Sequence, residues 1–162
     1  MTNEEKYQEY MVMARKIEES VVNEMPDFER LSSKQKIKKL STYLTSYTES
    51  QRSANTYAAR EKKNPKWKKD RELSEYLELL TGTRIKMCIQ RLSESEINMY
   101  VDNLSVKLAD VMIETDVKKK FKKHDIIMAG CQLCNVDNAE IMQRIADIKS
   151  KCVEMLKDIR TM

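Results

Sequence analysis

Apolar residues recur every three or four positions along most of the chain, which is the spacing of one face of an α-helix. The first such stretch runs from Tyr7 to Val22, and Pro26 is expected to stop its helix near Glu24, because the residue before a proline avoids the helical conformation. The second begins after Ser32 and continues to Asn64. The pattern therefore predicts one helix over residues 3–24 and a long one over residues 33–63.

The apolar pattern changes phase in the middle of the chain. Leu73, Tyr76, Leu77 and Leu80 form one stripe, and a second stripe, displaced by about a quarter of a turn, consists of Ile85, Cys88, Ile89 and Leu92. Gly82 lies at the change of phase, and glycine is a poor helix former. We therefore predict a kink or a break near Gly82.

Three further helices are predicted in the last part of the chain. Ser93 and Glu96 have the spacing of a capping box, as do Ser32 and Gln35. The helix after Ser93 keeps Ile97, Tyr100, Val101, Leu104, Leu108, Val111 and Met112 on one face. The next begins near Asp116 and is expected to end at Gly130, and the last, capped by Asp137, buries Ile141, Ile145, Ile148, Cys152, Met155 or Leu156, and Ile159. The prediction is a single all-α domain over residues 1–162, with six or seven helices.

The composition supports this fold class and limits the compartment. Two glycines and two prolines among 162 residues are few for strands joined by tight turns. No apolar run approaches the length of a membrane span, and the acidic N-terminus lacks a signal-peptide pattern. Without a secretion signal, the four cysteines are interpreted as reduced thiols. We expect a cytoplasmic protein with no membrane partner.

No motif for catalysis is found in the sequence. The two glycines lie too far apart to form a phosphate-binding loop, and His124, the only histidine, has no nucleophile beside it in sequence. We expect no enzyme activity, no cofactor and no small-molecule substrate. Cys131 and Cys134 form a C-x-x-C pair that, with His124 and Cys152, leaves a zinc site as an alternative to simple packing thiols.

Two basic clusters suggest contact with nucleic acid, because lysine and arginine side chains that neutralise phosphates release counterions. Trp67 lies among the lysines of the first cluster, and an exposed tryptophan there would stack on an unpaired base. The expected contacts are Lys62, Lys63, Lys66, Trp67, Lys68, Lys69 and Arg71 in the first cluster, and Lys118, Lys119, Lys120, Lys122 and Lys123 around Phe121 in the second. RNA or another single strand is the predicted partner. The alternative is that both clusters are solvated helix ends, with Trp67 and Phe121 turned inward.

A protein-interaction module, of viral, phage or host origin, is the rival interpretation. The chain has eleven methionines, and methionine-rich surfaces adapt to partners. In this reading the bend near Gly82 forms a groove, and Arg84 or Arg91 anchors the interface, as arginine often does. The same surface would also permit self-association.

Residues 31–40, followed by Tyr43, Leu44 and Tyr47, resemble the helix opening of the small subunits of type III CRISPR effector complexes. The similarity covers about residues 31–92, where Gly82 and Arg84 loosely match the family's Gly-Arg pair with Thr83 between them. The resemblance implies a small, basic, helical and non-catalytic subunit that stacks along a ribonucleoprotein complex and helps to hold guide and target RNA. The backbone contacts it implies are Lys34, Lys38, Lys39, Arg84 and Arg91.

Overall fold

A computed structural model describes residues 1–161, and it confirms the all-α prediction. Within that range the elements are α1 (Asn3–Glu29), α2 (Ser33–Lys63), the short 3-10 turn η1 (Pro65–Trp67), α3 (Lys68–Gln90), α4 (Glu94–Ile113), α5 (Val117–Gln132) and α6 (Ala139–Arg160). None of the helices in this part of the chain is both long enough and apolar enough to cross a membrane.

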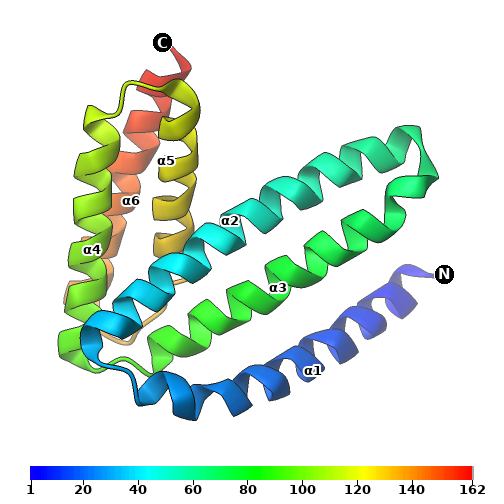
Figure 1. The fold of residues 1–162 in the computed structure, drawn as a ribbon, viewed down its shortest axis with the longest axis horizontal. Helices are drawn as coiled ribbons and strands as arrows, with labels where there is room; N and C mark the ends of the chain where they lie inside the picture. Colours follow the sequence, from blue (N-terminus) through cyan, green and yellow to red (C-terminus); the bar gives the residue numbers. More distant parts are fainter. Residues whose placement is uncertain (162) are drawn as a thin grey trace.

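The helices form two groups (Figure 1). In the first, α3 packs against both α1 and α2, and α2 and α3 form a long antiparallel hairpin whose free end is η1. In the second, α4, α5 and α6 pack against one another. The two groups meet where α4 and α5 contact α2, so the free end of the hairpin extends away from the second group.

Gly130 lies inside α5 and does not end it, so the C-terminus predicted there is wrong. The helix continues to Gln132, and no residue in the described range has a positive φ. A Cβ atom at Gly130 would lie 2.7 Å from Leu104 Cδ2 and 3.3 Å from Leu44 Cδ1. The Tyr100 hydroxyl donates a hydrogen bond of 2.7 Å to the Gly130 carbonyl. The glycine is needed because α2, α4 and α5 approach closely here.

Gly82 also lies inside a continuous helix, so of the predicted kink or break, the break is wrong. A Cβ atom at Gly82 would lie 3.1 Å from Tyr47 Cε2, which shows that α2 and α3 approach closely at this point. The buried side of α3 includes Ser74, Thr81 and Ile85. Of the apolar stripe identified before Gly82, Leu73, Tyr76 and Leu77 are exposed, whereas Leu80 is half-buried and packs against the core. The change of phase therefore separates an exposed apolar stripe from a buried one.

Pro26 does not end α1, which continues to Glu29. Proline inside a helix removes one backbone hydrogen bond and costs about 3 kcal/mol. Met25 and Phe28, on either side of it, are buried in the core. Burying two such side chains contributes about 1.5–3 kcal/mol each, which offsets the cost of the proline.

The predicted capping boxes at Ser32 and Ser93 are both confirmed. The predicted cap at Asp137 is wrong by one residue, because Asn138 Oδ1 accepts the hydrogen bond from the Ile141 amide at 3.0 Å. The apolar stripe of α6 is confirmed, with Met155 as its buried member near the C-terminus. Met112, expected on the buried face of α4, is exposed.

A buried ion pair joins the two groups of helices. Lys36 Nζ of α2 lies 3.1 Å from Glu96 Oε2 of α4. The same carboxylate accepts hydrogen bonds from the Ser93 amide at 2.9 Å and the Ser33 hydroxyl at 2.8 Å. These contacts lower the pKa of Glu96 to about 2. The hydrogen bond from the Ser93 amide has the largest effect, followed by those from Ser33 and Lys36. This lysine therefore has a structural role.

Candidate nucleic-acid interface

The first basic cluster forms the free end of the α2–α3 hairpin, and local sequence explains the turn. Asn64 leaves the helical conformation and caps η1, with its side chain accepting a hydrogen bond of 3.1 Å from the Lys66 amide. Pro65 occupies the first position of η1, where its missing N–H costs least. The turn therefore places the lysines that flank it at the end of a helix 31 residues long.

Trp67 packs on the hairpin rather than standing free. Its ring stacks on Tyr57 of α2 with centroids 5.6 Å apart and an angle of 21° between the planes. The Arg60 guanidinium lies 4.9 Å from the centroid of the Trp67 ring, and Lys66 Nζ lies 5.1 Å from it. Trp67 is half-buried, so the stack holds the end of the hairpin together while part of the ring stays accessible.

Arg71, predicted as a phosphate contact, is engaged within the hairpin. Its guanidinium pairs with Glu61 of α2 and, at 2.9 Å, with Glu75 of α3. Hydrogen bonds from Glu61 and then Glu75 raise the pKa of Arg71 above its usual value. This charge links α2 to α3 and is largely neutralised.

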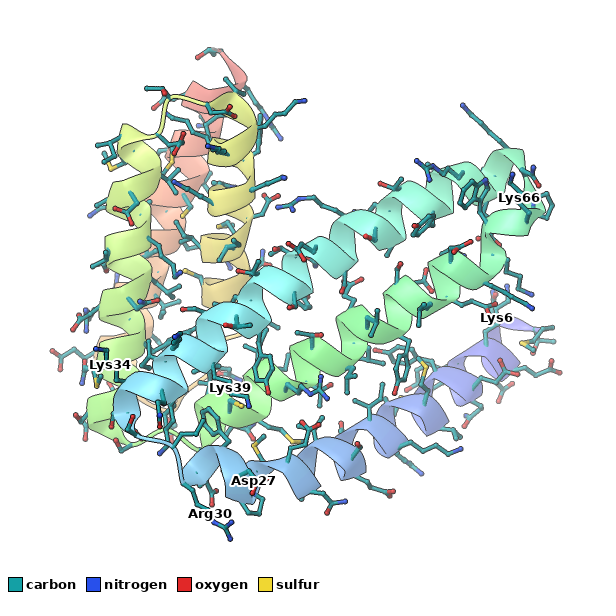
Figure 2. The ribbon with its side chains drawn as sticks, viewed as in Figure 1. Lys6, Asp27, Arg30, Lys34, Lys39 and Lys66 are labelled. Carbon is teal, nitrogen blue, oxygen red and sulfur yellow. The ribbon has the colours of Figure 1, made fainter. Side chains whose placement is uncertain are left out.

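Four exposed lysines remain at the end of the hairpin, and we call Lys62, Lys63, Lys66 and Lys69 the tip lysines. None of them forms an ion pair with another residue in the range 1–161. Lys68, also predicted, lies 3.8 Å from Glu72 on the surface of α3. Figure 2 shows Lys66 at the far end of the hairpin from the second group of helices.

The second basic cluster lies at the start of α5, away from the hairpin end (Figure 1). Lys118, Lys119 and Lys122 are exposed, while Lys120 is half-buried. Lys123 pairs with Glu114 at 2.9 Å, and this hydrogen bond is the main cause of a lowered Glu114 pKa. Phe121 packs against the core. The structure does not combine the two basic clusters into one surface.

The contacts implied by the CRISPR resemblance lie near the other end of α2. Figure 2 shows Lys34 and Lys39 there, far from Lys66. Arg84 binds both carboxylate oxygens of Glu24 at 2.9 and 2.7 Å, and Arg91 pairs with Glu29 at 2.9 Å. The two arginines therefore fasten α3 to α1.

Lys38 is exposed in the same region. Lys39 Nζ lies 5.8 Å from the centroid of the Tyr43 ring. Lys34, Lys38 and Lys39 form no ion pair within residues 1–161, so they keep their charge available on the surface of α2.

The histidine and cysteines of the zinc alternative are all buried. His124 Nε2 lies 3.1 Å from the Cys152 carbonyl oxygen, and His124 Nδ1 lies 3.3 Å from Asp125. Burial raises the pKa of Cys131 to about 12 and those of Cys134 and Cys152 to about 11. All four cysteines of the chain are unbonded, and residues 1–161 contain no group of three acidic, histidine or cysteine side chains placed to hold a metal ion.

Sequence reasoning missed two features around these sites. Tyr57 and Arg60 build the aromatic stack with Trp67, and only their spacing of one helical turn hinted at it. The second is the buried ion pair of Lys36. In the sequence Lys36 looks like the exposed lysines beside it, because nothing nearby indicates that its carboxylate partner is Glu96.

Comparison with known proteins finds no matching family model, no matching curated protein and no matching solved structure.

Proposed function

We propose that this protein is a non-enzymatic binding protein whose hairpin end contacts the phosphate backbone of RNA or another single strand. The observation that carries the proposal is the group of four exposed tip lysines, which lack ion-pair partners in residues 1–161. Their charge is available to phosphates, and displacement of counterions would supply affinity without sequence specificity.

The construction of the hairpin end supports this proposal. The Tyr57–Trp67 stack and the Arg71 bridge to Glu61 fix the turn, so the tip lysines project from a preorganised support. Less ordering is then needed on binding, which favours affinity.

Preference for a single strand rests on Trp67. Arg60 and Lys66 reach over its ring, and both are flexible side chains that a base can displace. Stacking on an unpaired base is worth about 1–3 kcal/mol, and a duplex does not offer its bases in this way.

A finer proposal follows from the resemblance to the CRISPR small subunits, namely that the protein is one subunit of a ribonucleoprotein complex. Lys34, Lys38 and Lys39 would then form a second RNA contact near the other end of α2. Arg84 and Arg91 are poor candidates for that role, because each is already paired with a glutamate of α1. A reducing compartment fits the four unbonded cysteines.

A protein-interaction module is the second candidate function. The specific observation that favours it is the exposed apolar stripe of α3, which includes Leu73, Tyr76 and Leu77. Such side chains on neighbouring turns of one helix form the kind of apolar patch that partners cover.

The test is binding of the nuclease-treated protein to a labelled single-stranded RNA and to a DNA duplex. A variant with the four tip lysines changed to glutamine is compared with the wild type. We expect wild-type affinity in the micromolar range or tighter for RNA, weaker affinity for the duplex, and a loss of at least about tenfold in the variant.

The matched control changes four exposed lysines elsewhere, Lys16, Lys86, Lys149 and Lys157, to glutamine, which removes the same charge. We expect this control to retain most of the RNA affinity. Equal losses in both variants would show that only net charge matters, and no binding by the wild type at low salt would refute the proposal.

A further inference from the structure

The turn between α4 and α5, with the residues on either side of it, exposes aliphatic side chains, and we call residues 112–123 the α4–α5 corner. Ile113 is 79% exposed, Met112 is 66% exposed and Val117 is 39% exposed. The three lie within six consecutive residues, so they share one corner of the fold. In Figure 1 this corner is at the end of the second group that also holds the C-terminus, away from the start of α2.

The α4–α5 corner also carries unpaired positive charge. It contains five lysines and two carboxylates. Lys118, Lys119 and Lys122 are exposed, and none of the three forms an ion pair with another residue in the range 1–161. The corner therefore combines exposed aliphatic side chains with available lysines.

The two carboxylates of the corner are engaged in local bonds. Glu114 Oε2 lies 2.9 Å from Lys123 Nζ, and Glu114 Oε1 accepts a hydrogen bond of 3.2 Å from the Asp116 amide. Asp116 caps α5, because its side chain accepts a hydrogen bond of 3.0 Å from the Lys119 amide. These bonds order the turn and leave the charges of the exposed lysines uncompensated.

The ends of three helices meet beside the corner. Met112 of α4 and Lys120 of α5 line a groove of about 350 Å³ together with Met155 and Ile159 of α6. Residues 151–160 of α6 contain three basic and two acidic side chains. The acidic side chains of α6 therefore do not cancel the positive charge at this end of the second group.

We propose that the α4–α5 corner binds the surface of an anionic lipid bilayer. Met112, Ile113 and Val117 enter the interface, and the exposed lysines lie among the headgroups. Stable attachment to a membrane generally needs an apolar signal and a basic one together, and the corner supplies both. The expectation of no membrane partner rested on the lack of a spanning segment, and contact with a bilayer surface needs none.

The chemistry of the corner favours a bilayer over other anionic partners. A single-stranded nucleic acid is held by stacking of its bases on aromatic rings, but Phe121, the one aromatic residue of the corner, packs against the core. A stable protein interface generally buries about 800 Å² on each partner, whereas the corner exposes three aliphatic side chains around one turn. A fluid bilayer needs no matching shape to receive them.

The test is co-sedimentation of the nuclease-treated full chain with lipid vesicles of two compositions. One is phosphatidylcholine alone, and the other contains about 30% phosphatidylserine, which supplies the negative surface. We expect binding to the anionic vesicles only. The triple variant Lys118→Gln, Lys119→Gln and Lys122→Gln should bind them about a hundredfold more weakly, because each lysine near an anionic surface contributes about fivefold.

The matched control for charge is the triple variant Lys6→Gln, Lys16→Gln and Lys86→Gln. These lysines are exposed on α1 and α3, so the control removes the same net charge at a distance from the corner. It should retain most of the vesicle affinity. Circular dichroism and urea unfolding verify that both variants fold.

The apolar part of the contact is tested separately. Met112→Ser with Ile113→Ser should weaken binding to the anionic vesicles at least about tenfold, because the apolar area that leaves water is lost. Val12→Ser with Val22→Ser removes exposed aliphatic side chains of α1 and should leave vesicle binding unchanged. Loss in the first variant alone is the expected result.

Insertion has a direct spectroscopic signature. Trp67 is the only tryptophan, so a chain with Trp67→Phe has none. In that background, Ile113→Trp should be quenched by vesicles that contain brominated acyl chains, and Val12→Trp should not. Purely electrostatic adsorption would leave both unquenched.

Four results would each overturn the proposal. They are no binding to anionic vesicles at low salt, equal losses in the two lysine variants, no loss in Met112→Ser with Ile113→Ser, and no quenching of Ile113→Trp. If the lysine variant of the corner keeps vesicle binding and loses RNA affinity, the corner contacts nucleic acid instead. RNA binding is tested through the tip lysines, so either proposal can fail alone.

Discussion

The two ends of α2 use the same residue type for opposite purposes. Near its start, Lys36 is buried and held by the carboxylate of Glu96, in a contact that fastens the hairpin to α4. At its far end, Lys62 and Lys63 are exposed and have no ion-pair partner in the described range. Density of positive charge in the sequence is similar at both ends, so it does not by itself mark a binding surface.

What separates Lys36 from the tip lysines, and also from Lys34, Lys38 and Lys39 near its own end of α2, is an ion pair with a carboxylate. Arg71, Arg84 and Arg91 each have one, and each joins two helices. The tip lysines have none. The comparison teaches that, in this protein, arginines tend to fasten helices, whereas the unpaired lysines remain available to a partner.

The largest effect on stability is expected at the buried end of α2. Lys36→Met leaves the Glu96 carboxylate buried without its cation, and breaking a buried pair costs about 3–5 kcal/mol. Urea unfolding at pH 7 measures the loss. The double variant Lys36→Met with Glu96→Met should recover part of it, because no unpaired charge remains. Wild-type stability of the single variant would show that the pair contributes nothing.

Acid should weaken the same end of α2. The pKa of Glu96 is lowered from its usual 4.5 to about 2 in the folded chain, so its contribution is complete above pH 4.5 and is lost as the pH falls towards 2. The shift corresponds to at most about 3 kcal/mol. The difference in unfolding free energy between the wild type and Glu96→Gln should therefore shrink across this window. A difference that stays constant with pH would contradict the assignment.

A smaller effect is expected from the aromatic stack at the free end. Trp67→Ala removes the ring that packs on Tyr57, at a cost of about 1–2 kcal/mol for a half-buried aromatic pair. Tyr57→Phe keeps the stack and serves as the control. Thermal unfolding reports stability, and RNA affinity should fall more than in Tyr57→Phe, because Trp67→Ala removes both the support of the tip lysines and the ring proposed to stack on a base.

The smallest effect on stability is expected from the tip lysines themselves. Changing all four to glutamine should alter the unfolding free energy by less than about 0.5 kcal/mol per site, since exposed side chains without partners contribute little. Urea unfolding of this variant beside Lys36→Met tests the contrast between the two ends of α2. A loss comparable to that of Lys36→Met would mean that the hairpin end is structural.

The sequence was sufficient for the fold class, for the capping boxes at Ser32 and Ser93, and for the apolar stripe of α6. It failed where the outcome depends on distant neighbours. Gly82 and Gly130 lie inside continuous helices, where Tyr47 and Leu104 leave little room for a Cβ atom, and those contacts join residues far apart in sequence. Pro26 was misread because the burial of Phe28 is a tertiary effect.

The exposed turn that holds the first basic cluster was predictable from the sequence, but the pairing of its side chains was not. The basic run from Arg60 to Arg71 does lie at an exposed turn, as its proline and asparagine indicate. Pairing between side chains of two helices decides which charges of this run are neutralised. Arg71 was predicted to contact phosphate because the sequence does not show that Glu61 is its partner. The apolar pattern at Leu73, Tyr76 and Leu77 did not reveal that these side chains are exposed, because spacing alone does not show which apolar face is covered.

The most direct test of the central claim is the salt dependence of RNA binding by the wild type and by the variant without the tip lysines. For a single strand, the slope of log affinity against log salt falls by about 0.7 for each phosphate neutralised. If all four lysines contact phosphates, the variant's slope should be shallower by about 2–3. An unchanged slope would show that the tip lysines do not touch the nucleic acid.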